Sequence, residues 1–294
     1  MNLQNPWYLC DINNFGDQFN RVLNRFYSLN AGFENIISKT NKVNSGIFGV
    51  GSILEHASDF YSGVIAGSGF MFSSSRKSFY HADVLAVRGS LTAERIFSHR
   101  SIFPLLDPGI LISKIYPASD KMFELGIVPH YIDFNSAHLE KFRQKYLNEV
   151  LIIDVKNDPK IVAEQISSCC NIASSSLHGL VVADSYSIPS VWIKLSNKLE
   201  GGEFKFYDYK SAYSINASPY LRTEYSLDNL LCACQDPPRS VQEKIQNADE
   251  LFNNLKEILL SHSKKNIIYK KINYLKRRFY RKILMKYRSI SSSY

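Results

Sequence analysis

The stretch that decides the fold runs Asn171-Ile-Ala-Ser174-Ser175-Ser176-Leu177-His178-Gly179-Leu-Val-Val-Ala-Asp184, and Ile188-Pro-Ser-Val-Trp-Ile193 follows it. A short apolar run comes first, then a serine-rich loop, a helical pattern, a proline and a second apolar run. Two buried strands joined by a helix form a βαβ unit, in which the strands are parallel. This stretch therefore predicts an α/β fold.

The same alternation continues along most of the chain. Because strands that alternate with helices form parallel sheets covered by helices on both faces, we expect an architecture of that kind. The expected strands are 64–66, 84–87, 126–132, 151–155, 171–173 and 190–193, and helix candidates include 161–169 and 177–186.

A break in the pattern divides the chain into two halves. It falls at Tyr116-Pro-Ala-Ser-Asp120, ahead of a new strand. We predict one domain over residues 1–120, a second over 121–262 and a tail over 263–294, which matches the usual size of domains. Near the end of the second domain, Ser240-Val-Gln-Glu243 has the pattern of a capping box and opens a helix with an apolar side. That side consists of Val241, Ile245, Ala248, Phe252, Leu255 and Leu259.

The charge of the chain is concentrated in its tail. The 294 residues include 35 Lys and Arg against 27 Asp and Glu, a net charge of +8. Eleven of the basic residues, and no acid, lie in 264–288. Removing these eleven leaves 24 basic against 27 acidic residues, a net charge of −3. A protein whose main task was binding nucleic acid would more often spread cations over a folded face, so we expect no nucleic-acid partner.

The tail also has an apolar stripe. Ile268, Ile272, Leu275, Phe279 and Ile283 recur at helical spacing. An apolar face surrounded by cations is typical of a helix that lies on an anionic membrane, although a helix packed on the body with a solvated basic side is the alternative. No signal peptide or transmembrane run is visible, and the five cysteines have no metal-type pairing. We expect a cytoplasmic protein, peripheral on the inner face of the cytoplasmic membrane.

The serine loop before His178 is the strongest candidate for chemistry. Free N–H groups at a helix start, joined by serine hydroxyls, form an anion site. The helix dipole lowers the pKa of a histidine in the first turn and keeps it neutral unless an anion binds. A single histidine is more often structural, but this one lies at the carboxyl end of a strand, where α/β proteins bind ligands.

Other polar or glycine-rich clusters follow strands in the same way. Gly67-Ser68-Gly69 is a small-residue loop that lets a ligand approach the backbone, and Arg88 and Asp107 each follow a strand. Each is weak alone, because glycine turns, surface arginines and Asp-Pro turns are common. The segment 194–209 is dense in charges, glycines and aromatics, which favours a site over a solvated loop.

Together these segments resemble the polysaccharide pyruvyltransferases, particularly the branch that makes pyruvate ketals on exopolysaccharides. The resemblance covers about residues 10–215, and its motifs occur in the family's order. They are Asn14-Phe-Gly-Asp17, Phe48-Gly-Val-Gly-Ser52-Ile-Leu, Gly67-Ser-Gly-Phe70, Val87-Arg-Gly89, Asp107-Pro-Gly109, Ile127-Val-Pro-His-Tyr-Ile-Asp133, Ser175-Ser-Leu-His-Gly179 and Lys205-Phe-Tyr-Asp-Tyr209.

The resemblance implies a GT-B-like fold, in which two Rossmann-like domains face each other across a cleft that holds the active site. It also implies phosphoenolpyruvate as donor and a sugar with two suitably placed hydroxyls as acceptor. Carried over by motif, Arg88, His178 and Lys198 form the donor-binding and catalytic group. Many family members have arginine where this chain has Ser176, so another cation must serve the donor, and Lys205 and Lys194 are the nearest candidates.

These implications assign roles to the candidate residues. Arg88 and Lys198 would hold the donor's anionic groups, because a carboxylate and a phosphate need several cations and N–H donors. His178 would act as general acid and base or bind the leaving phosphate. The weaker candidates for the acceptor are His130, Asp17 and Asp208. The predicted substrate-binding residues are Gly67, Ser68, Gly69, Asp107, Ser175, Ser176, Leu177, Lys205 and Asp208. No cofactor or metal is expected, because no metal ligands cluster.

The expected function is therefore pyruvyl transfer onto a sugar or lipid-linked oligosaccharide of a bacterial surface polysaccharide. The alternative is a GT-B glycosyltransferase with a nucleotide-sugar donor, for which Glu200, Glu203 and Asp208 could bind the ribose. A third interpretation is a protein without catalytic activity that the tail recruits to membrane or nucleic acid.

Overall fold

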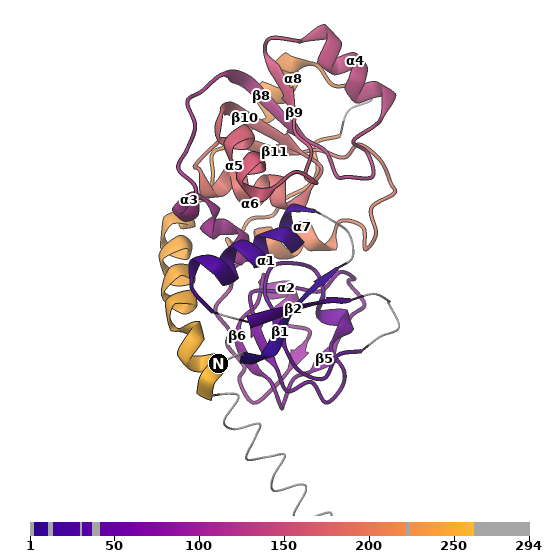
Figure 1. Ribbon diagram of the computed structural model, residues 1–294. Coiled ribbons are helices and arrows are strands. Elements are labelled where there is room, and N and C mark those ends of the chain that lie inside the picture. Colours follow the sequence, from indigo (N-terminus) through magenta and orange to yellow (C-terminus); the bar gives the residue numbers. More distant parts are fainter. Residues whose placement is uncertain (1–2, 11–13, 30, 37–41, 222–223, 262–294) are drawn as a thin grey trace, which may run out of the picture.

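Two parallel sheets form the framework of the protein. The structure, a computed structural model, describes residues 3–10, 14–29, 31–36, 42–221 and 224–261. Strands pair with their neighbours in the parallel sense in both sheets. In Figure 1 the first sheet lies in the lower half of the molecule and the second in the upper half. The chain is thus a mixed α/β protein with parallel sheets, as the sequence predicts.

The first sheet has the strand order β2-β1-β3-β4-β6. Its strands are β1 (Leu3–Cys10), β2 (Ala31–Ile36), β3 (Ile47–Phe48), β4 (Val64–Ala66) and β6 (Asp83–Ala86). The strand order reverses beside β1, and sheets of this kind usually bind ligands at the carboxyl ends of the strands at such a point. Helix α1 (Phe15–Phe26) begins at this edge, with Asn14 as its N-cap.

The second sheet has the order β11-β10-β8-β9. Its strands are β8 (Phe123–Val128), β9 (Val150–Ile152), β10 (Cys169–Ser174) and β11 (Ser190–Trp192). The helices that connect them are α4 (Ala137–Lys145), α5 (Pro159–Ser167) and α6 (Leu177–Ser185). The strand order reverses between β8 and β10, so the segments after Val128 and Ser174 meet at the ligand edge of this sheet.

Shorter elements complete both halves. The first half adds η1 (Leu54–His56), α2 (Ser90–Ala93) and a two-stranded sheet of β5 (Lys77–Ser78) and β7 (Ile96–Phe97). The link between the sheets contains η2 (Pro108–Leu111) and α3 (Ile112–Ile115), and α7 (Phe204–Ser211) and α8 (Leu227–Ala233) follow β11.

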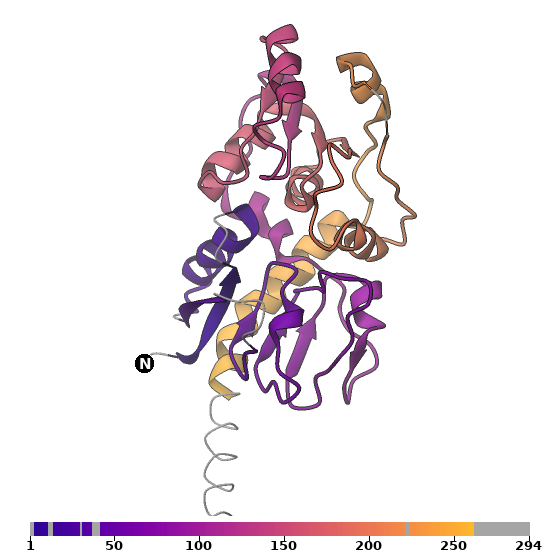
Figure 2. The same cartoon turned by 90° about the vertical axis from the view of Figure 1, so that its right-hand side faces the viewer.

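Residues 241–261 form a helix that returns to the first half. Figures 1 and 2 show it running along the side of that half. The ring of Phe252 stacks on that of Trp7 with 6.3 Å between centroids, and the Tyr27 hydroxyl donates a 2.7 Å hydrogen bond to Asp249. The predicted apolar side is confirmed, because all of its members are buried except the half-buried Ile245.

The predicted strands and helices both agree with the structure within a few residues, and the helices predicted at 161–169 and 177–186 correspond to α5 and α6. All six expected strands are present within a few residues, although β8 ends at Val128, before the predicted limit at residue 132. The interval between the sheets contains the predicted boundary at residue 120, while the limits 1–120 and 121–262 and the GT-B-like cleft stay predictions. The basic tail, 263–294, lies outside the described residues.

Candidate functional site

The imidazole of His178 lies where elements of the two halves meet. His178 is the second residue of α6, and its ring packs on the backbone at Gly16, in the first turn of α1. A Cβ at Gly16 would overlap the ring, and a Cβ at Gly109 would lie 3.4 Å from it. The ring of Phe15 is 5.7 Å from the imidazole centroid. Glycine is therefore needed at Gly16 for this ring to fit, whereas a Cβ at Gly109 would make an ordinary contact with it.

A second titratable group, Asp107, faces the imidazole. It caps η2 by accepting a 2.9 Å hydrogen bond from the amide of Gly109 through Oδ1. Its other oxygen, Oδ2, lies 3.9 Å from Nε2 of His178. Both of these atoms are buried, and neither has a hydrogen-bond partner within the part of the chain that the structure describes. A polar atom left in this state costs free energy, which makes the pair a candidate for ligand contact or proton transfer.

Burial sets the protonation of this pair. Loss of hydration raises the pKa of Asp107 to about 6, against the opposing effects of the Gly109 amide and Arg88. Loss of hydration, together with the positive charges of Lys205 and Arg88, lowers the pKa of His178 to about 3. His178 is therefore a neutral imidazole in the free protein near pH 7.

Lys205 is the candidate cation for binding an anion at this site. Its side chain extends from the first turn of α7, and only 9% of the residue is exposed. Burial, followed by the charge of Arg88, lowers the pKa of its ammonium group to about 8. Its Nζ lies 5.7 Å from the Phe206 ring centroid, and the negative charge of Glu200 partly opposes the lowering of its pKa. A buried ammonium ion is a place where an anion would bind.

His130 belongs to the same cluster. It follows β8, and its backbone amide donates a 2.9 Å hydrogen bond to the hydroxyl of Ser175, which follows β10. Burial lowers its pKa to about 3, and the charge of Lys205 contributes. Because Lys205 acts on both His130 and His178, one cation and two neutral imidazoles share this region.

The serine loop has an internal structure of its own. The hydroxyl of Ser174 donates to the carbonyl oxygens of Val128 and Ser176, and it accepts from the amide of Ser176. The hydroxyl of Ser175 accepts the hydrogen bond from the amide of His130, and the side chain of Leu177 is buried in the core. Ser176 is the N-cap of α6, but its side chain makes no capping hydrogen bond. The first amides of α6 are consequently left without a side-chain acceptor.

Arg88 differs from the expectation that it binds the donor directly. The side chain is fully buried, and Nε donates a 2.8 Å hydrogen bond to Oδ2 of Asp208. Nη2 donates to the carbonyl of Phe70 at 2.7 Å, and Nη1 donates to the hydroxyl of Ser52. In this geometry Arg88 joins the end of β6 to α7, and a direct contact with the donor stays a prediction.

Asp208 is equally occupied. Besides Arg88, it accepts hydrogen bonds from the amide and the hydroxyl of Thr92, both at 2.7 Å. Since Asp208 lies three residues after Lys205 on α7, these bonds fix the helix that carries the buried ammonium group. The role that this geometry supports for Asp208 is positioning, rather than contact with a substrate.

The small-residue loop at 67–69 packs against protein atoms. Gly67 has a φ of 107°, and a Cβ there would overlap Pro108, while a Cβ at Gly69 would overlap the guanidinium of Arg88. The hydroxyl of Ser68 donates a 2.8 Å hydrogen bond to the carbonyl of Gly51. These residues shape the environment of Arg88, and their predicted contact with substrate stays a prediction.

Three predicted site residues remain, and they differ in their position relative to the cluster of His178, His130 and Lys205. Lys198 is exposed after β11, and within the residues described no contact joins it to the cluster. Lys194 forms a 2.8 Å ion pair with Glu203. Asp17 follows Gly16 in α1 and accepts a 2.7 Å hydrogen bond from Nδ2 of Asn14. Asp17 therefore follows the residue on which the His178 ring packs, whereas no contact among the described residues joins either lysine to the cluster.

Two features of the site did not follow from residue types alone. The first is Gly16, which the motif Asn14-Phe-Gly-Asp17 contains but which carries no chemistry until the His178 ring is seen on it. The second is Asp184, a buried acid of α6 that accepts a 2.9 Å hydrogen bond from the Tyr209 hydroxyl. Asp184 and Tyr209 join α6 to α7 below the cluster.

Other candidate sites are less informative. A pocket of about 320 Å³ lies along β11 and contains none of the predicted site residues. No group of three or more His, Cys, Asp or Glu side chains suitable for a metal ion occurs among the described residues. Within the same residues, no helix has the length and apolarity to cross a bilayer.

Comparison with known proteins identifies the class to which this fold and site belong. The family model for polysaccharide pyruvyl transferases matches residues 16–197, more than half of the chain. The chain therefore belongs to the polysaccharide pyruvyl transferase family, as its motifs predict. The matched region includes Gly16, Asp107 and His178 and ends before Lys205.

Two relatives and one solved structure are similar to the chain. An uncharacterized protein of Acanthamoeba polyphaga mimivirus is 30% identical over 73% of this chain and 75% of its own length. Succinoglycan biosynthesis protein ExoV of Rhizobium meliloti (strain 1021) is 26% identical over 70% of this chain and 63% of its own. The wall teichoic acid polymerase TagF aligns over 90% of both chains with a TM-score of 0.41 and 10% identity, a likeness too weak to support a conclusion.

Proposed function

We propose that the protein transfers pyruvate from phosphoenolpyruvate to a sugar of a surface polysaccharide intermediate and forms a pyruvate ketal. Membership of the family supports pyruvyl transfer, and the relationship to ExoV supports a role in polysaccharide biosynthesis. The observation that carries the donor assignment is the buried Lys205 ammonium group, whose positive charge contributes to the lowered pKa of both His178 and His130.

The charge of the donor suits this cluster. Phosphoenolpyruvate has a carboxylate and a phosphate, which together need cations and N–H donors. Lys205 supplies one full charge, and the uncapped amides of α6 supply partial charges. A bound dianion would also raise the pKa of His178, which would then add a second cation beside the phosphate. In this scheme Lys205 is the cation that replaces the arginine absent at Ser176.

The chemistry needs one group that can both give and take a proton. The methylene carbon of the donor gains a proton, and the carbon bearing the phosphate becomes cationic. One sugar hydroxyl adds to that carbon. The bond between the same carbon and the phosphate oxygen then breaks, and the second sugar hydroxyl adds to the carbon to close the ketal ring. The two hydroxyl protons balance the one gained by the methylene and the one taken by the phosphate. We assign the transfer to His178, with Asp107 stabilising the imidazolium form.

The acceptor that we propose is a lipid-linked oligosaccharide at the inner face of the cytoplasmic membrane. The eleven Lys and Arg residues of the tail favour an anionic bilayer as the place of work. A bacterial-type pathway and this location are proposals that rest on the sequence of the tail and on the family.

The alternative, a glycosyltransferase with a nucleotide-sugar donor, receives less support from the geometry. Of the acids that could hold a ribose, Asp208 is buried against Arg88 and Glu203 is paired with Lys194. Thermal-shift titration separates the two functions. Phosphoenolpyruvate should raise the Tm, and nucleotide sugars should not. Stabilisation by a nucleotide sugar alone would contradict the proposal.

Mass spectrometry then tests the reaction itself. Candidate glycolipids incubated with the protein and phosphoenolpyruvate should gain the mass of a pyruvate ketal, and the reaction should release inorganic phosphate in equal amount. The His178→Ala variant is the control, because it keeps the fold of α6 while removing the group to which we assign the proton transfer.

A further inference from the structure

Exposed apolar side chains gather at one edge of the first sheet. Phe60 and Ile102 are 76% and 81% exposed, and Tyr80 and Phe97 are about half exposed. We call the three segments that carry them, 58–62, 77–82 and 96–103, the amino-edge patch. Single exposed apolar residues are ordinary on a protein surface, but a contiguous group of large ones indicates an interaction site.

Several contacts join these three segments. Ser78 in β5 pairs with Phe97 in β7, and the ring of Tyr80 lies 5.1 Å from that of His99. Tyr61, beside Phe60, packs its buried ring 6.0 Å from that of Phe79. The three segments therefore pack against one another, although they come from three parts of the sequence.

The patch lies opposite the candidate site on the same half. Phe60 precedes β4, and Gly67 follows it; Tyr80 precedes β6, and Arg88 follows it. Ile102 likewise precedes a short segment that ends at Asp107. Leu105 in this segment pairs in parallel with Val87, the residue after β6. Because these segments are parallel, their starts share one edge of the sheet and their ends share the other.

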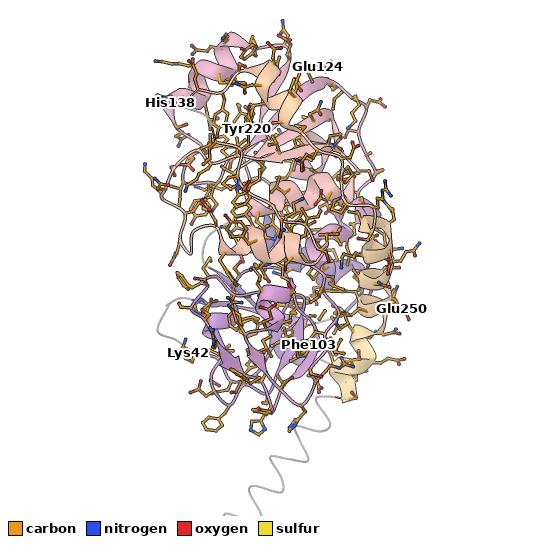
Figure 3. All side chains as sticks on the ribbon, turned by 180° about the vertical axis from the view of Figure 1, so that it is seen from behind. Lys42, Phe103, Glu124, His138, Tyr220 and Glu250 are labelled. Atoms are coloured by element: carbon orange, nitrogen blue, oxygen red, sulfur yellow. The ribbon has the colours of Figure 1, made fainter. Side chains whose placement is uncertain are left out.

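The chain also leaves the described structure at this end. Lys244, in the first turn of helix 241–261, donates to the carbonyl of Leu105 near the site edge. At 1.5 Å per residue, residue 261 lies about 25 Å further along the helix axis. Figures 1 and 2 show the helix ending at the end of the molecule away from the second half, and Figure 3 shows Phe103 and Glu250 in this lower half.

We propose that the amino-edge patch is the surface with which the protein docks on an anionic lipid bilayer. The 33 residues that follow residue 261 start at the same end and carry eleven Lys and Arg with no acid, so their charge complements anionic lipid. Arg100 adds positive charge within the patch, and the charge of its one acid, Asp59, is offset by Lys77 at 3.7 Å. Exposed rings and aliphatic side chains beside these cations enter the interfacial region of the bilayer.

This docking fixes the height of the site above the bilayer. From Ile102 to Asp107 and from Tyr80 to Arg88, extended chain spans about 15 to 25 Å. If the proposed function holds, the acceptor must reach that height from its lipid. The hydroxyl pair would then belong to a sugar several units from the anchor, rather than to the sugar attached to the lipid.

Vesicle cosedimentation of the full chain tests the surface. The patch variant Phe60→Ser/Ile102→Ser is compared with the control Leu147→Ser/Leu221→Ser, whose leucines are each 62% exposed on the second half. On vesicles of phosphatidylcholine and phosphatidylglycerol, the patch variant should bind about tenfold more weakly, because two large apolar contacts are lost. The control should bind like the unmodified chain. Equal binding by both variants would overturn the proposal, and Tm values for both establish that they fold.

A fluorescence measurement tests the orientation. In a Cys232→Ser background, an environment-sensitive dye is placed at Ile102→Cys or at Leu147→Cys. Phosphatidylglycerol vesicles should shift the emission to the blue at position 102 alone. A blue shift at position 147, or no shift at position 102, would overturn the proposed orientation on the bilayer. The same holds if the patch variant loses self-association but still binds vesicles, because the patch would then be a contact between copies of the chain. Failure of phosphoenolpyruvate to bind would count against the proposed function and leave these results unaffected.

Discussion

At the scale of single residues, Lys205 combines a functional gain with a cost in stability. Burial disfavours its charged form more than the opposite charge of Glu200 favours it. We expect Lys205→Met to raise the free energy of unfolding at pH 7 by about 1 to 3 kcal/mol, since a pKa lowered to about 8 marks a penalty of that order. The same change should abolish stabilisation by phosphoenolpyruvate. Urea unfolding and thermal shift measure both effects, with the exposed Lys141→Met as the control.

The pH dependence of stability gives this prediction a sign. The pKa of Lys205 is about 8 in the folded chain against an ordinary value of 10.5. Between pH 8 and 10 the unfolded chain therefore binds more protons at this residue, and its contribution to the free energy of unfolding rises with pH. The difference between the unmodified chain and Lys205→Met should grow smaller as pH rises. A constant difference from pH 7 to 10 would show that Lys205 is not a buried cation.

Asp107 and His178 make a second prediction at the residue scale. If Asp107 stabilises the imidazolium of His178, Asp107→Asn should lower kcat by about 10- to 100-fold and change the KM for phosphoenolpyruvate little. Because the pKa of Asp107 is raised to about 6, kcat of the unmodified chain should rise as pH passes 6, and the variant should lack this rise. A pH profile of kcat from 5 to 8 measures it. If the pH profile of kcat is the same in the variant, the role of Asp107 is limited to capping η2.

At the scale of secondary-structure elements, α7 is placed by the buried pair of Arg88 and Asp208. Removing one partner leaves an uncompensated buried charge, so Arg88→Met should cost about 3 to 5 kcal/mol in the free energy of unfolding. Combining it with Asp208→Leu should recover much of that stability. Activity should not return, because α7 loses the bonds that set the position of Lys205. Denaturant unfolding and turnover of the single and double variants test this, and full recovery of turnover in the double variant would contradict the positioning role.

The sequence predicted elements where local pattern dominates and missed them where distant contacts decide. The run from Asn171 to Trp192 gave β10, α6 and β11 almost to the residue, because apolar strands and a serine start are local signals. Helix α7 was interpreted as a site loop, since its charges and aromatics hide the helical period. The roles of its Lys205 and Asp208 become clear only from the hydrogen bond between Asp208 and Arg88, which lie 120 residues apart in the sequence.

The site shows the same division. His178 was predicted from its position at a helix start, and the structure brings it together with Asp107 and Lys205. Which cations remain available could not be read from the sequence. Arg88 and Lys198 have the same charge, yet one is fully buried in a hydrogen-bonded pair and the other is exposed. Burial and pairing depend on the tertiary fold, which a motif does not encode.

At the scale of the whole molecule, helix 241–261 ties the two halves together. Phe252 is fully buried against Trp7 of β1, and Gln242 donates a 3.5 Å hydrogen bond to the hydroxyl of Ser187, which follows α6 in the second half. A helix that packs on elements of both halves makes their unfolding cooperative. The second half, predicted to end at residue 262, therefore includes a segment that also stabilises the first.

A core substitution tests this role. Phe252→Ala should lower the free energy of unfolding by about 3 to 5 kcal/mol, since it opens a cavity against Trp7. Both sheets should still unfold in one transition when calorimetry is compared with Trp fluorescence, for which Trp7 and Trp192 report on different halves. Two separate transitions in the unmodified chain would contradict the coupling, and the helix would then belong to the second half alone.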